Sequence, residues 1–226
     1  MRISSRWGGE RVHFQTLPVG FLDTNCYVLS GNPPDALVID AGADAETIIA
    51  HLDAAALVPA MLVVTHGHSD HIAANEELME HYGDIEIAVG RADAPALTSP
   101  KRNMSAYVGL QVVTPEADRL LDDGDELTVA GLTFRVLALP GHSPGGIGLY
   151  ADDLAGAPAL FSGDTLFARS VGRTDIAGGD PATLVASIRE KIFMLDDETI
   201  VYPGHGPATT VGEEKASNPF VRSDGS

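Results

Sequence analysis

Three histidines and an aspartate lie within six residues of one another, directly after an apolar run at 61–64. They are His66, His68, Asp70 and His71, and three of the chain's eight histidines in six positions are not expected by chance. A buried strand that opens into a loop of such side chains is a rigid way to hold a metal ion. Imidazole and carboxylate groups suit zinc, iron and manganese. The spacing also lets one loop serve two ions, because alternate side chains can face opposite sides.

Three further apolar runs end in a glycine-flanked histidine or aspartate. Runs 137–140, 159–162 and 199–203 are followed by His142, Asp164 and His205. The glycines allow tight turns and close backbone approach at the ends of strands. A single histidine near a core strand is more often a hydrogen-bonded structural residue than a ligand. The combination with the first motif favours the metal-binding interpretation.

The seven residues divide into two sets of metal ligands. His66, His68 and His142 would bind one ion, Asp70, His71 and His205 a second, and Asp164 would bridge them. Two such ions are typically about 3.5–4 Å apart, which a carboxylate spans. The other bridging position would hold a water whose pKa the cations lower toward neutrality. A structural zinc site is closed by four protein ligands, so this open arrangement predicts catalysis.

The order of these ligands resembles that of the metallo-β-lactamase fold superfamily, over nearly the whole chain. The resemblance begins at 25–29 and 37–42, which are similar to the opening strands and the Asp-x-Gly turn of that family. The segments 163–167, 172–175 and 202–207 resemble the glyoxalase II-like thioesterases, in particular their short single-domain bacterial branch. The resemblance implies an α/β protein with a four-layer αββα sandwich. Two mixed β-sheets would pack face to face with helices outside.

The resemblance also implies an activity, the hydrolysis of a thioester such as S-D-lactoylglutathione by a metal-bridging hydroxide. Asp70 and Asp164 would position this hydroxide while they bind the metal ions. No serine or cysteine nucleophile is needed for this reaction. In the family, the position of Asp40 braces the metal loop as a hydrogen-bond acceptor outside the metal ligands. Full-length glyoxalase II has an additional helical domain whose basic residues grip glutathione. Only 21 residues follow His205 here, with Lys215 and Arg222 as their basic residues, so another thiol carrier or a simpler thioester fits equally well.

Three alternatives stay open at this point. Glutathione persulfide dioxygenases are similar at 172–175 but use one iron held by two histidines and one aspartate, whereas all seven ligands are present here. A lactonase would use the same dinuclear site on another substrate. A closed structural or sensing metal centre would be favoured by the loss of a ligand, and none is missing. Because Asp164 supplies oxygen, the zinc β-lactamases that use a cysteine ligand are less favoured.

Two polar segments are secondary candidates for the site. Arg173 is predicted to bind a substrate carboxylate or to pair with Asp175 and shape the loop, and the alternative is an ion pair that only orders it. The segment 99–107 holds the adjacent basic residues Lys101 and Arg102. This segment would either cover the site or carry ordinary solvated charge.

Composition limits the partners and the surroundings of the chain. The 226 residues are 44% hydrophobic and 20% charged, and without a linker or repeat they predict a single domain, 1–226. No apolar run reaches transmembrane length, and residues 1–7 precede no apolar signal core, so a cytoplasmic location and no membrane partner are expected. A net charge of −18 repels phosphate backbones and predicts no nucleic-acid partner. Cys26 is expected in the core.

The predicted cofactor is a pair of divalent metal ions, with zinc expected first and iron or manganese also fitting the donor set. The predicted partner is a small-molecule thioester, and no pattern defines the oligomeric state. Helices are predicted at 44–57, 71–82 and 181–194, with Asp44 and Asp70 as N-caps, and no structure is assigned to 91–118. Strands are predicted near 12–16, 25–30, 36–40, 61–64, 85–89, 126–130, 132–138, 146–150, 158–162 and 199–202.

Overall fold

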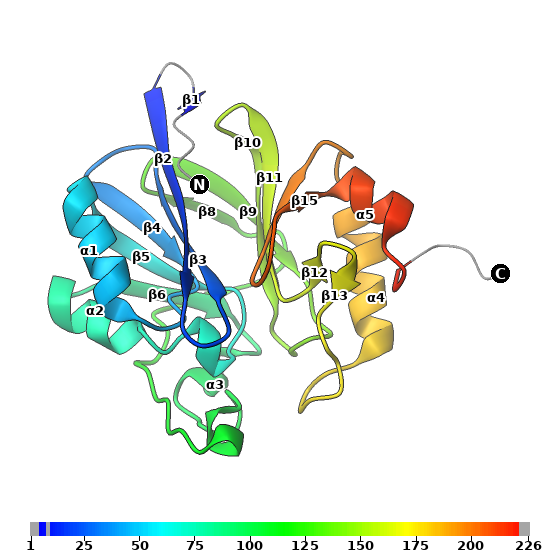
Figure 1. The fold of residues 1–226 in the computed structure, drawn as a ribbon, viewed down its shortest axis with the longest axis horizontal. Helices are drawn as coiled ribbons and strands as arrows, with labels where there is room; N and C mark the ends of the chain where they lie inside the picture. Colours follow the sequence, from blue (N-terminus) through cyan, green and yellow to red (C-terminus); the bar gives the residue numbers. More distant parts are fainter. Residues whose placement is uncertain (1–4, 8–9, 222–226) are drawn as a thin grey trace.

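Two β-sheets packed face to face form the centre of the computed structural model, which describes residues 5–7 and 10–221 (Figure 1). The first sheet contains β1 (Ser5–Trp7), β2 (Glu10–Val19), β3 (Thr24–Ser30), β4 (Asp35–Ile39), β5 (Val58–Val64), β6 (Glu86–Gly90) and β7 (Arg119–Leu121), in that spatial order. The strands from β4 to β7 run parallel and the earlier ones antiparallel, so the sheet is mixed.

The second sheet is mixed as well. Its spatial order is β15 (Thr209–Thr210), β14 (Ile200–Pro203), β11 (Ala157–Gly163), β10 (Ile147–Leu154), β9 (Leu132–Ala138) and β8 (Glu126–Val129). Only the pair β11–β14 is parallel among these described strands. A small ribbon of β12 (Leu166–Phe167) and β13 (Ser170–Val171) follows β11.

Helices cover the outer face of each sheet (Figure 1). Against the first sheet lie α1 (Ala45–Ala55) and α2 (Asn75–Tyr82), with the short α3 (Ala94–Leu97) near the sheet's end. Against the second lie α4 (Pro181–Glu190) and α5 (Val211–Ser217). This arrangement confirms the predicted four-layer αββα sandwich.

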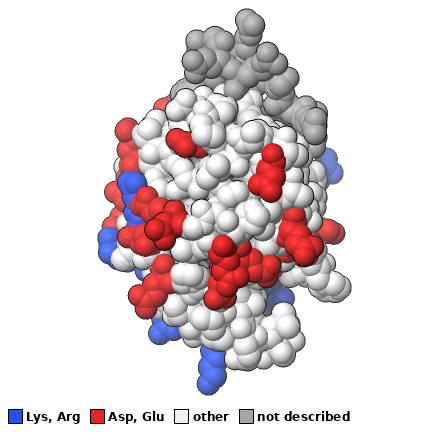
Figure 2. All heavy atoms as spheres, turned by 90° about the vertical axis from the view of Figure 1, so that its left-hand side faces the viewer, with Lys and Arg blue, Asp and Glu red and all other residues white. Residues whose placement is uncertain are grey.

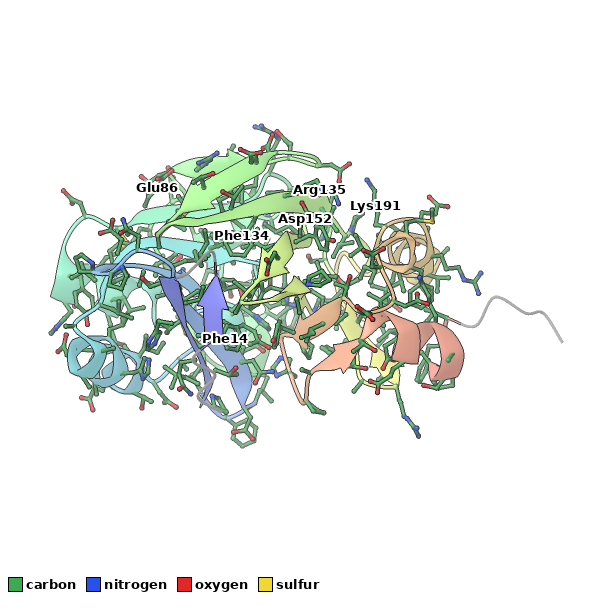
Figure 3. The ribbon with its side chains drawn as sticks, turned by 90° about the horizontal axis from the view of Figure 1, so that it is seen from above. Phe14, Glu86, Phe134, Arg135, Asp152 and Lys191 are labelled. Atoms are coloured by element: carbon green, nitrogen blue, oxygen red, sulfur yellow. The ribbon has the colours of Figure 1, made fainter. Side chains whose placement is uncertain are left out.

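Three apolar clusters fill the spaces between the four layers. The central cluster joins the sheets and includes Phe14 and Phe134, which Figure 3 labels in the interior. The second lies between the first sheet and its helices, where Ile48 and Leu52 are fully buried. The third packs α4 against the second sheet. Cys26 is fully buried in the second cluster, as expected, and burial raises the pKa of its thiol.

The predicted helix at 71–82 is wrong at its start. Residues Ser69–His71 form one 3-10 turn, and α2 begins only at Asn75. Asp70 is therefore not an N-cap, because its carboxylate faces the histidines beside it instead of a helix terminus. Asp44 is the N-cap residue of α1, as predicted, but it makes no side-chain capping bond. It has a left-handed conformation, and its carboxylate accepts the Gly20 N–H at 2.8 Å instead of an N–H of the helix.

Other differences concern short elements. The predicted helix at 181–194 ends at Glu190 and continues as the 3-10 turn Ile192–Met194. The unassigned segment 91–118 holds α3 and a second 3-10 turn, Ser105–Val108. No helix in the described part of the chain is long and apolar enough to cross a bilayer.

The surface formed by α1 and α2 is acidic. Figure 2 shows Asp and Glu side chains across this face, with Lys and Arg mainly at its edges. Glu46, Asp53, Glu76, Glu77 and Glu80 are the exposed acidic residues of the two helices. Such a face would repel phosphate backbones, and the absence of a nucleic-acid partner stays a prediction.

Candidate metal centre

The predicted ligands meet where the two sheets join at one edge. The loops after β5, β9, β11 and β14 carry them, because each of these strands ends at that edge. Backbone hydrogen bonds tie the sheets together there, from Ile147 N–H to Thr65 O at 2.8 Å and from Asn25 N–H to Gly204 O at 2.7 Å. Loops fixed in this way hold side chains more precisely than free loops do.

The first set of ligands is closely packed and buried. Ligand atoms of His66, His68 and His142 all lie within 4.8 Å of one another. His142 Nε2 is 2.9 Å from His68 Nδ1. The three residues are between 2% and 8% exposed. Three nitrogen atoms at these distances can share one ion.

The second set is Asp70, His71 and His205, which meet the same 4.8 Å criterion. Asp70 Oδ2 lies 3.5 Å from His71 Nε2 and 3.2 Å from His205 Nε2. His71 is fully buried, whereas the side chains of Asp70 and His205 are about one quarter exposed. The site is therefore open to solvent on this side.

Asp164 lies between the two sets. Its Oδ1 is 3.5 Å from His71 Nε2, and its Oδ2 is 3.6 Å from His142 Nε2 and 3.5 Å from His205 Nε2. One carboxylate therefore reaches histidines of both sets, which is the arrangement that a bridging ligand requires. The structure brings all seven predicted residues into one cluster. Two groups within it contain the predicted ligand sets, and a third group, His66, His71 and Asp164, connects them.

Several ligand atoms in the cluster lack hydrogen-bond partners within the described protein. His66 Nε2, His71 Nε2 and Asp164 Oδ1 are buried and unpaired. An unpaired buried polar atom costs about 1–3 kcal/mol, so three together need an explanation. Cations bound at the cluster would satisfy all three atoms. The donor set of imidazoles and carboxylates fits divalent metal ions.

Hydrogen bonds on the far side of the rings select the tautomer that metal binding requires. His71 Nδ1 donates to Asp40 at 2.9 Å, and His142 Nδ1 donates to the Arg173 carbonyl at 2.8 Å. His205 Nδ1 donates in the same way to a backbone carbonyl, at 3.0 Å. With the proton on Nδ1, each Nε2 presents a lone pair to the cluster.

The electrostatics of the cluster also match a cation site. Burial, with the neighbouring His142 and His71, lowers the pKa of His68 to about 3. Burial alone would lower the pKa of His71, but the carboxylates of Asp40, Asp70 and Asp164 outweigh it and raise that pKa to about 10. The carboxylates around His71 thus favour a positive charge at this position, which a bound metal ion would supply.

Asp40 braces the metal loop as a hydrogen-bond acceptor, as the resemblance implied. It is 1% exposed and its two oxygens accept hydrogen bonds from Thr65 N–H, Thr65 Oγ1 and His71 Nδ1, at 2.7, 2.7 and 2.9 Å. Asp40 therefore fixes both the start of the metal loop and the ring of one ligand. This is the contact that positions a metal-binding histidine.

Asp175 forms the predicted pair with Arg173. Among the described residues its carboxylate pairs with the guanidinium of Arg173, at 2.8 and 2.9 Å, and touches none of the seven ligands. Both side chains are mostly exposed, at 64% for Arg173 and 74% for Asp175. It is the backbone carbonyl of Arg173 that contacts His142. The ion pair shapes this loop, and its effect on the ligand is indirect.

Gly204 is required by the close approach of two strand ends. A Cβ at this position would collide with Asp164 Oδ1 and lie 2.8 Å from His71 Cε1. The glycine before His205 therefore leaves room for the carboxylate that reaches both ligand sets.

Comparison with known proteins identifies the family. A family model described as the metallo-beta-lactamase superfamily matches residues 19–205, which include all seven cluster residues. The chain belongs to the metallo-beta-lactamase superfamily. Its similarity to hydroxyacylglutathione hydrolase GloC of Haemophilus influenzae is 36% identity over 218 residues, which covers 94% of this chain and 99% of that one.

Two solved structures of the superfamily are also similar over most of their length. The BLEG-1 B3 metallo-beta-lactamase is 40% identical, with a TM-score of 0.87 and coverage of 92% of this chain and 99% of its own. TTHA1623 in a di-iron-bound form is 36% identical, with a TM-score of 0.80 and coverage of 91% and 99%. As a member of the metallo-beta-lactamase superfamily with this His/Asp cluster, the chain is a metal-dependent hydrolase.

Sequence analysis missed one residue, Asp93, that joins two of the loops carrying the cluster. Asp93 is 4% exposed, and its carboxylate accepts the N–H of Gly67 at 2.9 Å and of Gly145 at 2.7 Å. It thereby joins the loop of His66 and His68 to the loop of His142. The only local signal is an aspartate soon after β6, in the segment that could not be assigned.

Asp93→Ala is expected to lower the free energy of unfolding by about 3 kcal/mol, because two buried N–H groups lose their acceptor. It should also weaken metal binding by the first ligand set, whose loops it connects. Denaturant unfolding and the metal content of the purified protein measure the two effects. Asp118→Ala is the matched control, since Asp118 accepts one backbone N–H from Ile87 away from the cluster. Equal metal content in Asp93→Ala and the control would contradict this role.

Proposed function

We propose that the chain is a glyoxalase II-like thioesterase that hydrolyses S-D-lactoylglutathione or a related thioester with two divalent cations, zinc in the first place. The observation that carries the proposal is the pair of ligand sets sharing Asp164. The similarity to GloC, which is named as a hydroxyacylglutathione hydrolase, supports the substrate class over almost the whole length of both chains.

The carboxylates have the main role among the chain's own groups. When bound, the two cations supply Lewis acidity that polarises a thioester carbonyl and lowers the pKa of water. Asp70 and Asp164 would accept hydrogen bonds from a water held between the ligand sets and so orient it toward the substrate. Although burial opposes it, the charges of His71 and His205 lower the pKa of Asp70, which stays ionised as an acceptor.

Arg173 is the proposed contact for a carboxylate of the substrate. Its backbone carbonyl accepts a hydrogen bond from His142 Nδ1 at 2.8 Å, so the residue lies next to the first ligand set. The bidentate pair with Asp175 limits the directions in which the guanidinium can point. A large exposed fraction leaves its remaining N–H groups available for a ligand.

Hydrolysis of a β-lactam is the second candidate, because the BLEG-1 structure at 40% identity is described as a B3 metallo-beta-lactamase. Both ligand sets are complete, which disfavours the persulfide dioxygenase, because the single iron of that enzyme needs only two histidines and one aspartate. TTHA1623, solved in a di-iron-bound form, supports iron as an alternative metal for the same cluster.

The proposal is tested with zinc-loaded protein and a panel of substrates. S-D-lactoylglutathione and simple acetyl thioesters are expected to be cleaved with release of a free thiol, and removal of zinc by a chelator should abolish the reaction. Thiol release is followed with a chromogenic disulfide. Cleavage of a β-lactam or a lactone, with no turnover of any thioester, would contradict the proposal and select the corresponding alternative.

A further inference from the structure

A pocket opens beside the metal centre on the side of His68. It has a volume of about 270 Å³. Its walls come from the metal loop at 67–68, from the segment 92–102 and from residues 143–144 and 177–178. Because His68 belongs to both the pocket and the first ligand set, a molecule bound in the pocket lies next to that set. Pockets of this kind, with a few polar groups, typically hold the non-reacting part of a ligand.

Two adjacent cations line this pocket without a partner. Lys101 and Arg102 are exposed, and neither side chain forms an ion pair or hydrogen bond within the described residues. In contrast, Arg91, Arg173 and Lys191 each pair with an aspartate. In a chain of net charge −18, two neighbouring positive charges without an acidic partner are unusual and can attract an anion locally.

The backbone that carries these cations is fixed relative to the metal loop. Asn103 is fully buried, and its amide donates to the carbonyls of Ala96 at 3.1 Å and Val112 at 2.8 Å. The backbone carbonyl of Asn103 accepts the N–H of Ser69 at 2.8 Å, and Ser69 directly follows His68 in the chain. Lys101 and Arg102 therefore extend from a braced turn at the mouth of the site.

The pocket wall also holds one buried carboxylate. Asp93 adds a negative charge, but both of its oxygens already accept backbone N–H groups. Ser143 belongs to the wall as well, but its hydroxyl oxygen is buried. The groups left over for a ligand are therefore the two cations.

We infer that this pocket is an anion subsite, in which Lys101 and Arg102 bind a carboxylate on the part of the thioester that does not react. The subsite makes the site selective for anionic thioesters over neutral ones. This inference rests on the proposed thioester hydrolysis for its substrate class. The carboxylate belongs to the thiol half of the substrate, because the lactoyl half of S-D-lactoylglutathione has none, and the kinetic experiment compares this source with a carboxylate on the acyl half.

The first test measures binding and needs no turnover. S-Methylglutathione, a thioether that cannot be hydrolysed, is titrated calorimetrically into zinc-loaded wild-type protein and into the double variant Lys101→Met/Arg102→Gln. The double variant is expected to bind about tenfold more weakly, because two charge-assisted hydrogen bonds are lost. The dimethyl ester of the same thioether should bind both proteins equally weakly. Equal affinity of the two proteins for S-methylglutathione would overturn the inference.

The control variant changes the net charge by the same amount elsewhere. Arg119→Gln/Lys191→Gln removes two cations that contact Glu126 and Asp123, outside the pocket. It should bind S-methylglutathione as the wild type does. A loss equal to that of Lys101→Met/Arg102→Gln would show that overall charge and not the pocket is responsible, which would also overturn the inference.

Kinetics then locate the carboxylate. S-Acetyl-3-mercaptopropionate carries it on the thiol half and the S-ethyl monothioester of succinic acid on the acyl half, and each is compared with its methyl ester. The preference for the acid is the kcat/KM of each acid divided by the kcat/KM of its methyl ester. In the double variant this ratio should fall by about tenfold for the substrate whose carboxylate occupies the pocket. Unchanged ratios for both would contradict the inference. If the wild type cleaves no thioester, the proposed function fails, and the calorimetric result still decides the subsite.

Discussion

Asp164→Asn is expected to lower kcat/KM for thioester hydrolysis by about 10³-fold or more while the fold stays intact, because it removes the charge that the two proposed cations would share. Asp164 reaches His71, His142 and His205 at 3.5–3.6 Å. An asparagine has the same shape, but it offers one neutral oxygen and places an NH₂ group beside a cation. Metal content should fall below that of the wild type, with at least one of the two ions lost.

The measurements for this variant are thiol release, metal content by mass spectrometry and thermal unfolding of the metal-free protein. Burial raises the pKa of Asp164 against the effect of the neighbouring histidines, so a neutral side chain is tolerated in the metal-free cluster. Asp153→Asn is the control, since Asp153 accepts one exposed backbone N–H in the turn between β10 and β11. Turnover by Asp164→Asn close to that of this control would refute the shared role of the carboxylate.

Asp40→Ala is expected to have the largest effect on stability, with a decrease of about 4 kcal/mol in the free energy of unfolding. Three donors, two from Thr65 and one from His71, would lose their buried acceptor. Asp40 also has a φ of 55°, which alanine adopts less readily than aspartate does. Because the ring of His71 is no longer fixed, metal affinity should fall by about 10–100-fold as well.

Chemical denaturation of the metal-free protein and competition with a chromogenic chelator measure these two effects. Asp44→Ala is a closely matched control, because Asp44 also has a positive φ, of 49°, and accepts one exposed N–H from Gly20. It should show a much smaller loss of stability and normal metal affinity. A similar result for both variants would mean that Asp40 serves only the backbone conformation.

The metal centre could be predicted from the sequence because each ligand follows directly on a strand. Apolar runs mark β5, β11 and β14, and a residue just beyond the end of a strand stays near that end in any compact fold. Four of the seven ligands also lie close together in one loop, so their pattern can be recognised in a short stretch of sequence. The prediction that the ends of four separate strands meet depended on the family resemblance, because no local pattern shows which strands are neighbours.

The segment 91–118 could not be predicted because its structure depends on contacts with distant residues. Asp93 is placed by Gly67 and Gly145, and Asn103 by Ser69 and Val112. None of these partners can be inferred from the local sequence. Lys101 and Arg102 were visible as a basic pair, but their position beside His68 follows from the turn that Asn103 holds.

The start of α2 was mispredicted for a related reason. The pattern at 71–82 is compatible with a helix, but Asp70 and His71 face the ligand cluster. The chain therefore forms a single 3-10 turn, leaves helical geometry at Ile72 with φ −131°, and begins α2 at Asn75. Contacts at a functional site override local helix propensity here.

The central claim, that two cations share one cluster through Asp164, is tested most directly by titrating metal-free protein with zinc under anaerobic conditions. Bound zinc and the rate of S-D-lactoylglutathione hydrolysis are followed in the same samples. The account predicts that both saturate together at about two equivalents of zinc per chain. Saturation of binding and activity at a single equivalent would contradict it.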